Sequence, residues 1–172
     1  MKVHLRLDSG EDTDPASSSD SLEELLSAAG EVFAGALEEL VPAGLLPPEA
    51  EISVTLLSPD EMAEQNMLHR GIESPTDVLS FPLWEEEGSF RPGRGMPVLP
   101  LGDIVICPRY VADNLPPGRT FIEEAALMLA HGFLHLLAWD HDTDSGEAAM
   151  EAAQVRISRA LCDMAAEGGR EK

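Results

Sequence analysis

The chain is poor in basic side chains and has no long hydrophobic run. Only 11 of its 172 residues are lysine or arginine against 32 aspartates and glutamates, a formal net charge of −21. This excess of acid argues against any broad electrostatic grip on nucleic acid. No apolar stretch reaches the roughly 18 uncharged residues of a membrane span, and the opening MKVHLRLDSGED lacks the apolar core of a signal peptide. We therefore expect a cytoplasmic protein.

Cysteine is also scarce. The two present, Cys107 and Cys162, lie far apart and lack the close spacing of a cysteine metal site. Buried, reduced thiols are the expectation for both.

The negative charge is unevenly spread. Residues 1–65 hold two basic and fifteen acidic side chains, residues 120–172 hold four and ten, and residues 66–119 hold five and seven. An anionic substrate is therefore expected to meet the middle segment through arginine, while the acidic flanks are most simply solvated faces.

The remaining composition is that of an ordinary globular protein, with 44% hydrophobic and 25% charged residues. The length suits one domain, and no internal repeat is visible. We predict a single domain over residues 1–172.

Hydrophobic periodicity and turn residues predict alternating short elements. Strands are expected at 1–7, 51–57, 76–82 and 101–108, with loops at 8–20 and 84–100. Helices are expected at 21–40 and at about 144–166. A further helix should run from a cap at Ser58 to a stop at Gly71. Another should run from a T-x-x-E capping box at Thr120 to about Ala138. The fold class is α+β: one mixed β-sheet of about four strands packed against helices.

The helix that begins at Thr120 is apolar on nearly every face between Phe121 and Leu137. A helix of this kind is buried, so we expect it at the centre of the molecule.

This buried helix carries two of three clustered histidines. The segment HGFLHLLAWDH places His131, His135 and His141 within eleven residues, although the chain has only five histidines. Residues four apart share one helix face, so the first two imidazoles can point at one metal ion, and His141 must return from beyond the helix end. The alternative is three separate core histidines, each bonded to backbone. Because three buried rings would each need a partner, a shared metal is favoured, with zinc as first choice.

The spacing partly matches the H-E-x-x-H motif of metalloproteases. In those enzymes the residue after the first histidine is the glutamate that activates water; here it is Gly132, which has no side chain to act as a base. The comparison is compatible with a metal site but argues against a metalloprotease. A glycine inside a helix costs about 1 kcal/mol relative to alanine, which indicates close packing or close approach of a ligand at this position.

At the level of whole motifs the chain resembles the YbeY family of bacterial endoribonucleases and ribosomal RNA maturation factors. HGFLHLLAWDH is similar to the family signature H-G-x-L-H-L-x-G-Y-D-H. Residues 66–82, NMLHRGIESPTDVLSFP, resemble its L-N-x-x-Y-R-x-x-x-x-P-T-D-V-L-S-F-P block, and residues 101–107, LGDIVIC, its G-D-I strand.

The resemblance implies one zinc ion held by His131, His135, His141 and a water. It also implies that the arginine at position 70 is important for the activity on RNA. It implies a single-strand-specific endoribonuclease that matures the 3′ end of 16S ribosomal RNA and serves late ribosome quality control. The implied partners are precursor ribosomal RNA, the small ribosomal subunit and its assembly factors.

Two positions depart from the family pattern. Ala138 and Trp139 stand where Gly-Tyr is usual, and His69 stands where tyrosine usually precedes the arginine. If the family's glycine reverses the chain in a left-handed conformation, alanine there costs about 1–2 kcal/mol. His69 is expected to be a surface or pocket residue, not a ligand.

The expected chemistry follows from these parts. Zinc on three histidines keeps one position for water, lowers the pKa of that water to about 7 and can polarise a phosphoryl oxygen. Arg70 could clamp the phosphate, or it could form only a surface salt bridge. Asp140, next to the third histidine, could orient an imidazole.

The other carboxylates near the motifs have simpler explanations. Asp77 and Asp103 are expected to cap turns beside strands, and Glu124 to belong to its helix start. None is a convincing general base.

Two other classes of function stay open. One is a metallohydrolase of another substrate; the other is a non-catalytic ribosome assembly factor stabilised by zinc. A purely structural site would be closed by a fourth protein ligand, with Asp140, Asp142 and Cys107 as the candidates. For a nuclease, the surface around the histidines should be markedly less acidic than the rest.

Overall fold

The computed structural model describes residues 1–10, 20–139 and 144–168. In this part of the chain, four strands form one sheet in the order β1-β2-β6-β3, in which β1–β2 and β2–β6 are parallel and β3–β6 is antiparallel. A small separate hairpin pairs β4 with β5. The strands are β1 (Lys2–Ser9), β2 (Glu49–Leu56), β3 (Val78–Pro82), β4 (Glu85–Glu86), β5 (Ser89–Phe90) and β6 (Val98–Ile106).

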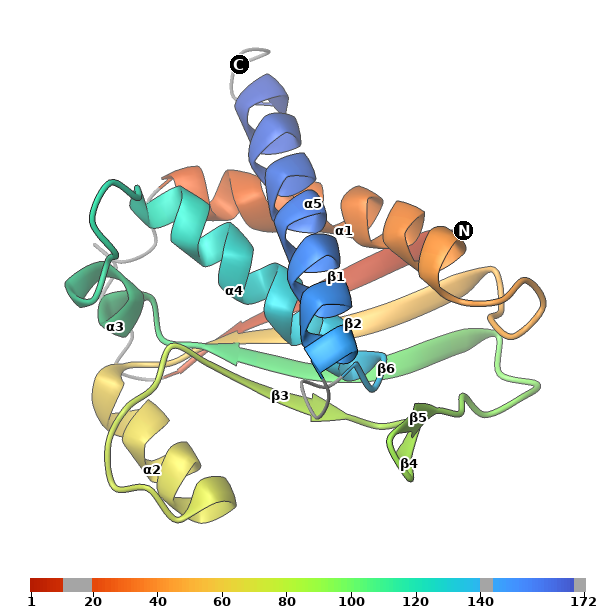
Figure 1. Cartoon of the computed structure of the whole chain (residues 1–172), viewed down its shortest axis with the longest axis horizontal. Coiled ribbons are helices and arrows are strands. Elements are labelled where there is room, and N and C mark those ends of the chain that lie inside the picture. The colour runs from red at the N-terminus through yellow and green to blue at the C-terminus, as the bar shows by residue number, and fades with distance from the viewer. Residues whose placement is uncertain (11–19, 140–143, 169–172) are drawn as a thin grey trace.

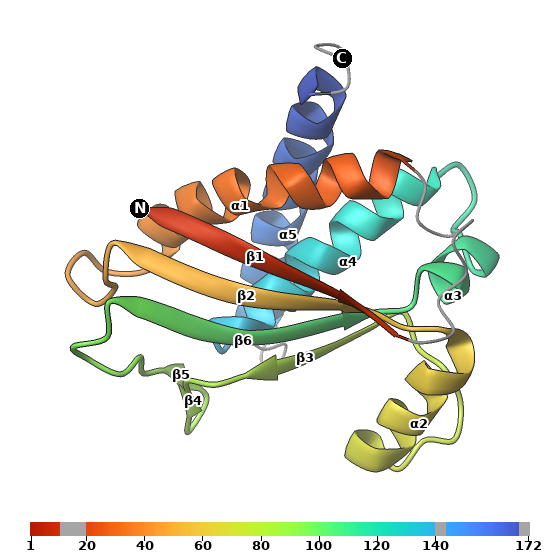
Figure 2. The same ribbon diagram turned by 180° about the vertical axis from the view of Figure 1, so that it is seen from behind.

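Two helices, α1 and α4, cover one face of the sheet, α5 packs on both of them, and α2 lies against the other face. Figures 1 and 2 show α1, α4 and α5 stacked on one side, with α5 running steeply away from the sheet, while α2 projects on the opposite side. The short α3 follows β6 at one end of the sheet. The helices are α1 (Asp20–Leu40), α2 (Pro59–Arg70), α3 (Pro108–Asp113), α4 (Phe121–Leu136) and α5 (Asp144–Gly168).

Strand alternation separates two apolar clusters. The larger cluster lies between the sheet and the layer of α1, α4 and α5, and includes Ile104 and Ile106 of β6. The intervening Val105 points to the other face, where it packs with Leu79 and with Met62 of α2. Because side chains alternate along a strand, β3 and β6 each contribute residues to both clusters.

Helix α4 lies at the centre of the larger cluster. Phe133 is fully buried and stacks on Phe33 of α1, with ring centroids 4.3 Å apart and an interplanar angle of 1°. Helix α5 packs against both α4 and α1, and Arg156 of α5 donates a hydrogen bond to Glu39 of α1 at 2.6 Å. The histidine-bearing helix is therefore held from the sheet side and from the helix side.

The predicted fold class, a mixed sheet of about four strands against helices, is confirmed, and so is the central burial of the helix after Thr120. The expected capping box is present at Thr120–Glu123. The expected cap at Ser58 is also present and forms a capping box with Glu61, and Gly71 ends α2 with φ 71°.

Several boundaries differ from the prediction. The expected loop at 84–100 contains the β4–β5 hairpin and the start of β6, α3 was not predicted, and α4 ends two residues before Ala138. Most of the predicted loop at 8–20 lies outside the described residues. Within the described ranges no helix is both long and apolar enough to cross a membrane.

Candidate functional site

The first two histidines of the predicted triad meet on one face of α4. The Nε2 atoms of His131 and His135 lie 3.0 Å apart, and the two half-buried rings stand nearly edge to face at 77°. Two nitrogens bound to one zinc ion at 2.0–2.1 Å in tetrahedral geometry lie about 3.4 Å apart. The donor type and the separation of this pair therefore fit a zinc ion with only a small movement of the rings.

The third predicted ligand, His141, and its neighbour Asp140 lie outside the described residues, as does Asp142. Among the residues that the structure describes, no group of three or more His, Cys, Asp or Glu side chains could hold a metal ion. Cys107, a candidate fourth ligand, is buried in the small cluster with Met62 on the far side of the sheet.

Helix α4 ends in a turn that reverses the chain beside the histidines. The N–H of Ala138 donates to the carbonyl of His135 at 3.0 Å, and the N–H of Trp139 donates to that of Leu134 at 3.1 Å. This pair of bonds is the Schellman motif, whose left-handed residue is usually glycine. Ala138 occupies that position with φ 58°, so the left-handed turn considered from sequence is present with alanine in it.

Arg70 reaches the same site from a different element. It is the last residue of α2, which Gly71 terminates in a left-handed conformation. The exposed Arg70 side chain forms no ion pair with any described residue, unlike Arg109, which pairs with Asp113 at 2.8 Å. The surface salt bridge considered for Arg70 is therefore absent from the described part of the chain, and its guanidinium faces the histidine site.

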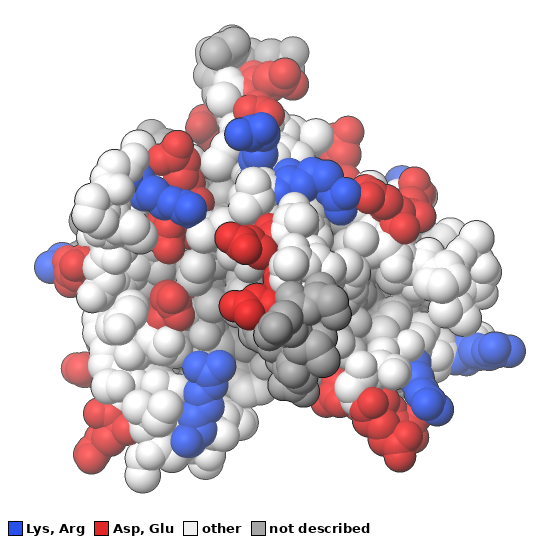
Figure 3. Space-filling view, viewed as in Figure 1, with Lys and Arg blue, Asp and Glu red and all other residues white. Residues whose placement is uncertain are grey.

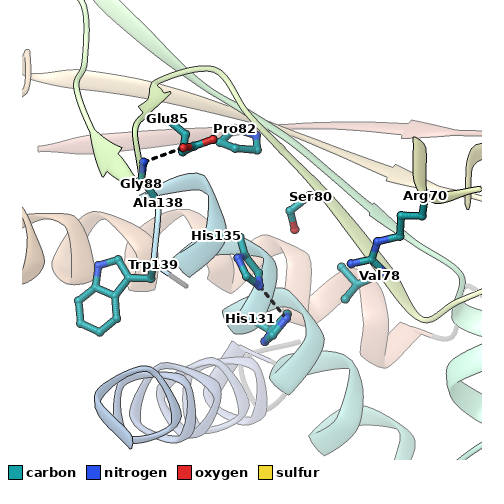
Figure 4. A pocket seen from close by; sticks show the side chains of 10 residues that line it. All are labelled: Arg70, Val78, Ser80, Pro82, Glu85, Gly88, His131, His135, Ala138 and Trp139. Carbon is teal, nitrogen blue, oxygen red and sulfur yellow. Dashed lines mark hydrogen bonds between the residues drawn. The ribbon is translucent and has the colours of Figure 1, made fainter. Parts of the chain in front are cut away.

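A cavity of about 180 Å³ joins these groups. Figure 4 shows the imidazoles of His131 and His135 on one wall, Arg70 beside Val78 at one end, and Ala138 and Trp139 at the other. The cavity is lined by Arg70, Val78, Ser80, Pro82, Glu85, Gly88, His131, His135, Ala138 and Trp139.

Gly132 allows α4 to lie close to the sheet under this cavity. A β-carbon on Gly132 would be 2.9 Å from Cγ2 of Ile104 and 3.1 Å from the hydroxyl of Ser80. These two residues are direct partners across β6 and β3. The glycine therefore serves close helix–sheet packing, one of the two reasons expected from the sequence, and it brings the histidines against β3.

Two of the three carboxylates considered from the sequence, Asp77 and Glu124, have hydrogen-bond partners close in the chain. Asp77 accepts hydrogen bonds from the hydroxyl of Thr76 at 3.0 Å and from the N–H of Val78 at 2.8 Å, so it caps the start of β3 as predicted. Asp103 lies within β6, paired with Phe81, and caps no turn. Glu124 accepts from Arg119 at 3.2 Å.

A second hollow of about 460 Å³ adjoins the cavity and shares Arg70, Val78 and His131 with it. Its lining adds the carboxylates of Asp77, Glu147 and Glu151. The prediction of markedly less acidic surroundings is therefore wrong on this side, although Arg70 keeps the lining mixed in sign. Figure 3 likewise shows acidic and basic side chains interspersed over the face that carries α5.

Sequence reasoning overlooked two residues of the site. Ser80 enters the cavity because Val78 and Ser80 alternate with Leu79 on β3, a signal that was present in the strand pattern. Gln154 of α5 has its amide oxygen 3.0 Å from Nδ1 of His131. No sequence signal marked Gln154, because its place depends on how α5 crosses α4.

The sequence is similar to the members of one known protein family. The sequence pattern of the family described as endoribonuclease YbeY matches residues 16–162. Proteins named endoribonuclease YbeY are 44% identical in Moorella thermoacetica, over 78% of this chain and 85% of that protein, and 43% identical in Symbiobacterium thermophilum, over 72% and 78%.

A solved structure has the same fold. The solution structure of a Thermotoga maritima protein superposes with a TM-score of 0.60 at 27% identity, covering 99% of this chain and 95% of the other.

Fold and site together define a class: a small α+β protein that presents a helix-borne histidine pair and an arginine in one cavity. Within that class, the chain belongs to the endoribonuclease YbeY family.

Proposed function

We propose that this chain is a zinc-dependent endoribonuclease that cuts single-stranded RNA. Its substrate would be the 3′ end of precursor 16S ribosomal RNA, cut in the cytoplasm on the small subunit with its assembly factors, and the cut would also serve late quality control of ribosomes. Support comes from family membership and from relatives named endoribonuclease YbeY.

The single observation that carries the proposal is the convergence in one cavity of a histidine pair and an arginine without an ion-pair partner among the described residues. His131 and His135 present nitrogens 3.0 Å apart, and Arg70 lines the same cavity. Imidazole nitrogens suit zinc, and a guanidinium suits a phosphate. Together they make a site for a metal and a phosphodiester.

Each residue then has a distinct task. His131 and His135, with His141 as the proposed third ligand, would hold the ion. A zinc ion bound there would supply a Lewis acid for a phosphoryl oxygen. Arg70 would bind the non-bridging oxygens of the scissile phosphate and balance the negative charge that develops during cleavage.

The shape of the cavity favours an unpaired strand. The imidazoles are half-buried on α4, between β3 and the Ala138–Trp139 turn. A phosphate must enter this cavity to reach both Arg70 and the histidines. An unpaired strand can bend to do so, whereas an A-form duplex presents its phosphates on a stiff and broad surface.

The test compares cleavage of a single-stranded RNA oligonucleotide by the wild type, His135→Ala and Arg70→Glu, with zinc content measured in each protein. We expect His135→Ala to lose both zinc and cleavage. Arg70→Glu should keep zinc and lose cleavage by a factor of about 100 or more, since removing one electrostatic donor commonly costs that much.

Two matched controls make the comparison specific. Arg94→Glu makes the same charge change at an exposed arginine that does not line the cavity, and His4→Ala removes an exposed histidine of β1. At saturating RNA, where encounter with the substrate does not limit the rate, both should cleave as the wild type does. Equal cleavage by all variants would assign the activity to a contaminant, and zinc binding without any cleavage would support the non-catalytic assembly factor instead.

A further inference from the structure

His131 has a second polar contact, on the ring edge remote from His135. Its Nδ1 lies 3.0 Å from Oε1 of Gln154, whereas its Nε2 faces Nε2 of His135. An amide oxygen only accepts hydrogen bonds, so the ring must donate from Nδ1. In a neutral imidazole this leaves the lone pair on Nε2, the atom that faces the metal site.

We propose that Gln154 is a positioning residue that fixes the tautomer and the ring orientation of His131 for zinc binding. The proposal rests on the proposed function, because it assumes that the histidine pair binds zinc. Metal-binding histidines characteristically donate their other ring N–H to an acceptor, and losing that acceptor typically lowers metal affinity 10- to 100-fold.

The packing of α5 holds Gln154 in the required place. The buried stripe of α5 includes Met150, Ala153 and Ile157, which join the main core. Gln154 follows Met150 by one turn and is half-buried at the margin of this stripe, where it lines the hollow shared with His131. The packing of α5 therefore holds the Gln154 backbone where its side chain can contact the imidazole.

The choice of glutamine over glutamate has an electrostatic reason. Asp77, Glu147 and Glu151 already line the same hollow, so a carboxylate at position 154 would add a fourth negative charge. A neutral amide accepts the Nδ1 proton without that repulsion. A carboxylate would accept it more strongly, so zinc affinity should be retained or raised in Gln154→Glu.

The test uses the full chain with Gln154→Met, which keeps the length of the side chain but has no acceptor, and Gln154→Glu, which keeps the acceptor. Arg159→Met is the matched control, because Arg159 is exposed on the same helix and does not line either hollow at the histidines. Thermal unfolding of each variant checks that the fold is intact.

Two readouts are needed. One is the zinc dissociation constant, from competition with a chelator; the other is the tautomer of His131, from ring nitrogen shifts in metal-free protein, assigned with His131→Asn. We expect Gln154→Met to bind zinc at least about 10-fold more weakly and to lose the Nδ1–H tautomer. Gln154→Glu should keep both, and Arg159→Met should change neither.

The outcomes separate this proposal from the proposed function. Wild-type affinity or a wild-type tautomer in Gln154→Met overturns the positioning role, even if the protein cleaves RNA. A wild-type chain that binds no zinc overturns the proposed function and with it the reason for the positioning, whereas zinc binding without RNA cleavage leaves the positioning of His131 intact and removes only the nuclease.

Discussion

Ala138 adopts a backbone conformation that suits glycine better than alanine. Its φ of 58° lies in the left-handed region, where a β-carbon crowds the neighbouring carbonyl. The two Schellman hydrogen bonds that end α4 nevertheless keep the residue there. In the sequence, this strained residue therefore stands between the histidine pair and His141.

Replacing Ala138 by glycine should relieve this strain. We expect Ala138→Gly to raise the free energy of unfolding by about 1 kcal/mol, since the left-handed penalty of about 1–2 kcal/mol is partly offset by the greater flexibility of glycine in the unfolded chain. Urea unfolding monitored by circular dichroism would measure the change.

The matched control is Ala152→Gly, at an exposed position in the middle of α5. That change should lower stability by about 1 kcal/mol, because glycine is a poor helix former. If both substitutions destabilise the protein to the same extent, the turn after α4 carries no strain.

At the scale of elements, α4 and the sheet are in contact through Gly132. We expect Gly132→Ala to lower the free energy of unfolding by up to about 2 kcal/mol, because the new methyl group would crowd Ile104 and Ser80. Overpacking typically costs about 1–3 kcal/mol, which outweighs the gain of about 1 kcal/mol from helix propensity. Gly35→Ala is the control: nothing lies within 4 Å of a β-carbon there.

Gly35→Ala should therefore gain about 1 kcal/mol from helix propensity alone. Urea unfolding of both variants measures whether the free energy of unfolding falls in Gly132→Ala and rises in Gly35→Ala. A gain in both variants would contradict the close contact between α4 and β6.

The capping box at the start of α4 predicts a dependence of stability on pH. Hydrogen bonds from the backbone and the hydroxyl of Thr120, aided by Arg119, lower the pKa of Glu123 below its ordinary value of 4.5. A carboxyl whose folded pKa is lowered stabilises the fold above its unfolded pKa, and this contribution is lost as the pH falls through the folded pKa.

Glu123→Gln should accordingly be less stable than the wild type at pH 7, and the difference should shrink as the pH falls below 4.5. Thermal unfolding across this pH range measures the difference between the two proteins. A difference that stays constant down to the lowest pH would show that the carboxylate charge plays no part in the cap.

These elements also show what the sequence could and could not predict. The caps at Ser58, Gly71 and Thr120 are local signals, so the helices that they bound were predicted closely. The six-residue α3 and the two-residue strands of the hairpin are too short for a periodic signal.

The order of the strands and the layout of the site depend on contacts between distant segments. The central place of β6 and the approach of α5 to α4 arise from tertiary packing, which single-sequence patterns do not encode. For that reason the i, i+4 spacing found His131 and His135, whereas the contact between His131 and Gln154, 23 residues apart, was missed.

At the scale of the whole molecule, the net charge of −21 opposes the approach of RNA. Salt screens this repulsion, with a Debye length that falls from about 30 Å at 0.01 M to about 10 Å at 0.1 M. We expect the second-order rate of RNA cleavage to rise over this range, the opposite of a basic nuclease. Initial rates at low substrate concentration measure it.

Arg94→Glu gives a control for this prediction, because it makes the chain more negative by two charges at an exposed position outside the cavity. The rise with salt should be steeper in this variant. A rate that falls with added salt in both proteins would mean that the local field of Arg70 outweighs the charge of the whole chain.

The position of β6 between β2 and β3 has a consequence for how the protein assembles during translation. β6 pairs with β2, which precedes it by about forty residues, and the histidine helix follows both. Such pairing between distant segments carries a large loop-closure entropy and slows folding. The sheet cannot be completed until the ribosome has delivered Ile106, and the histidine pair follows on α4, so the candidate site takes shape only in the final third of synthesis.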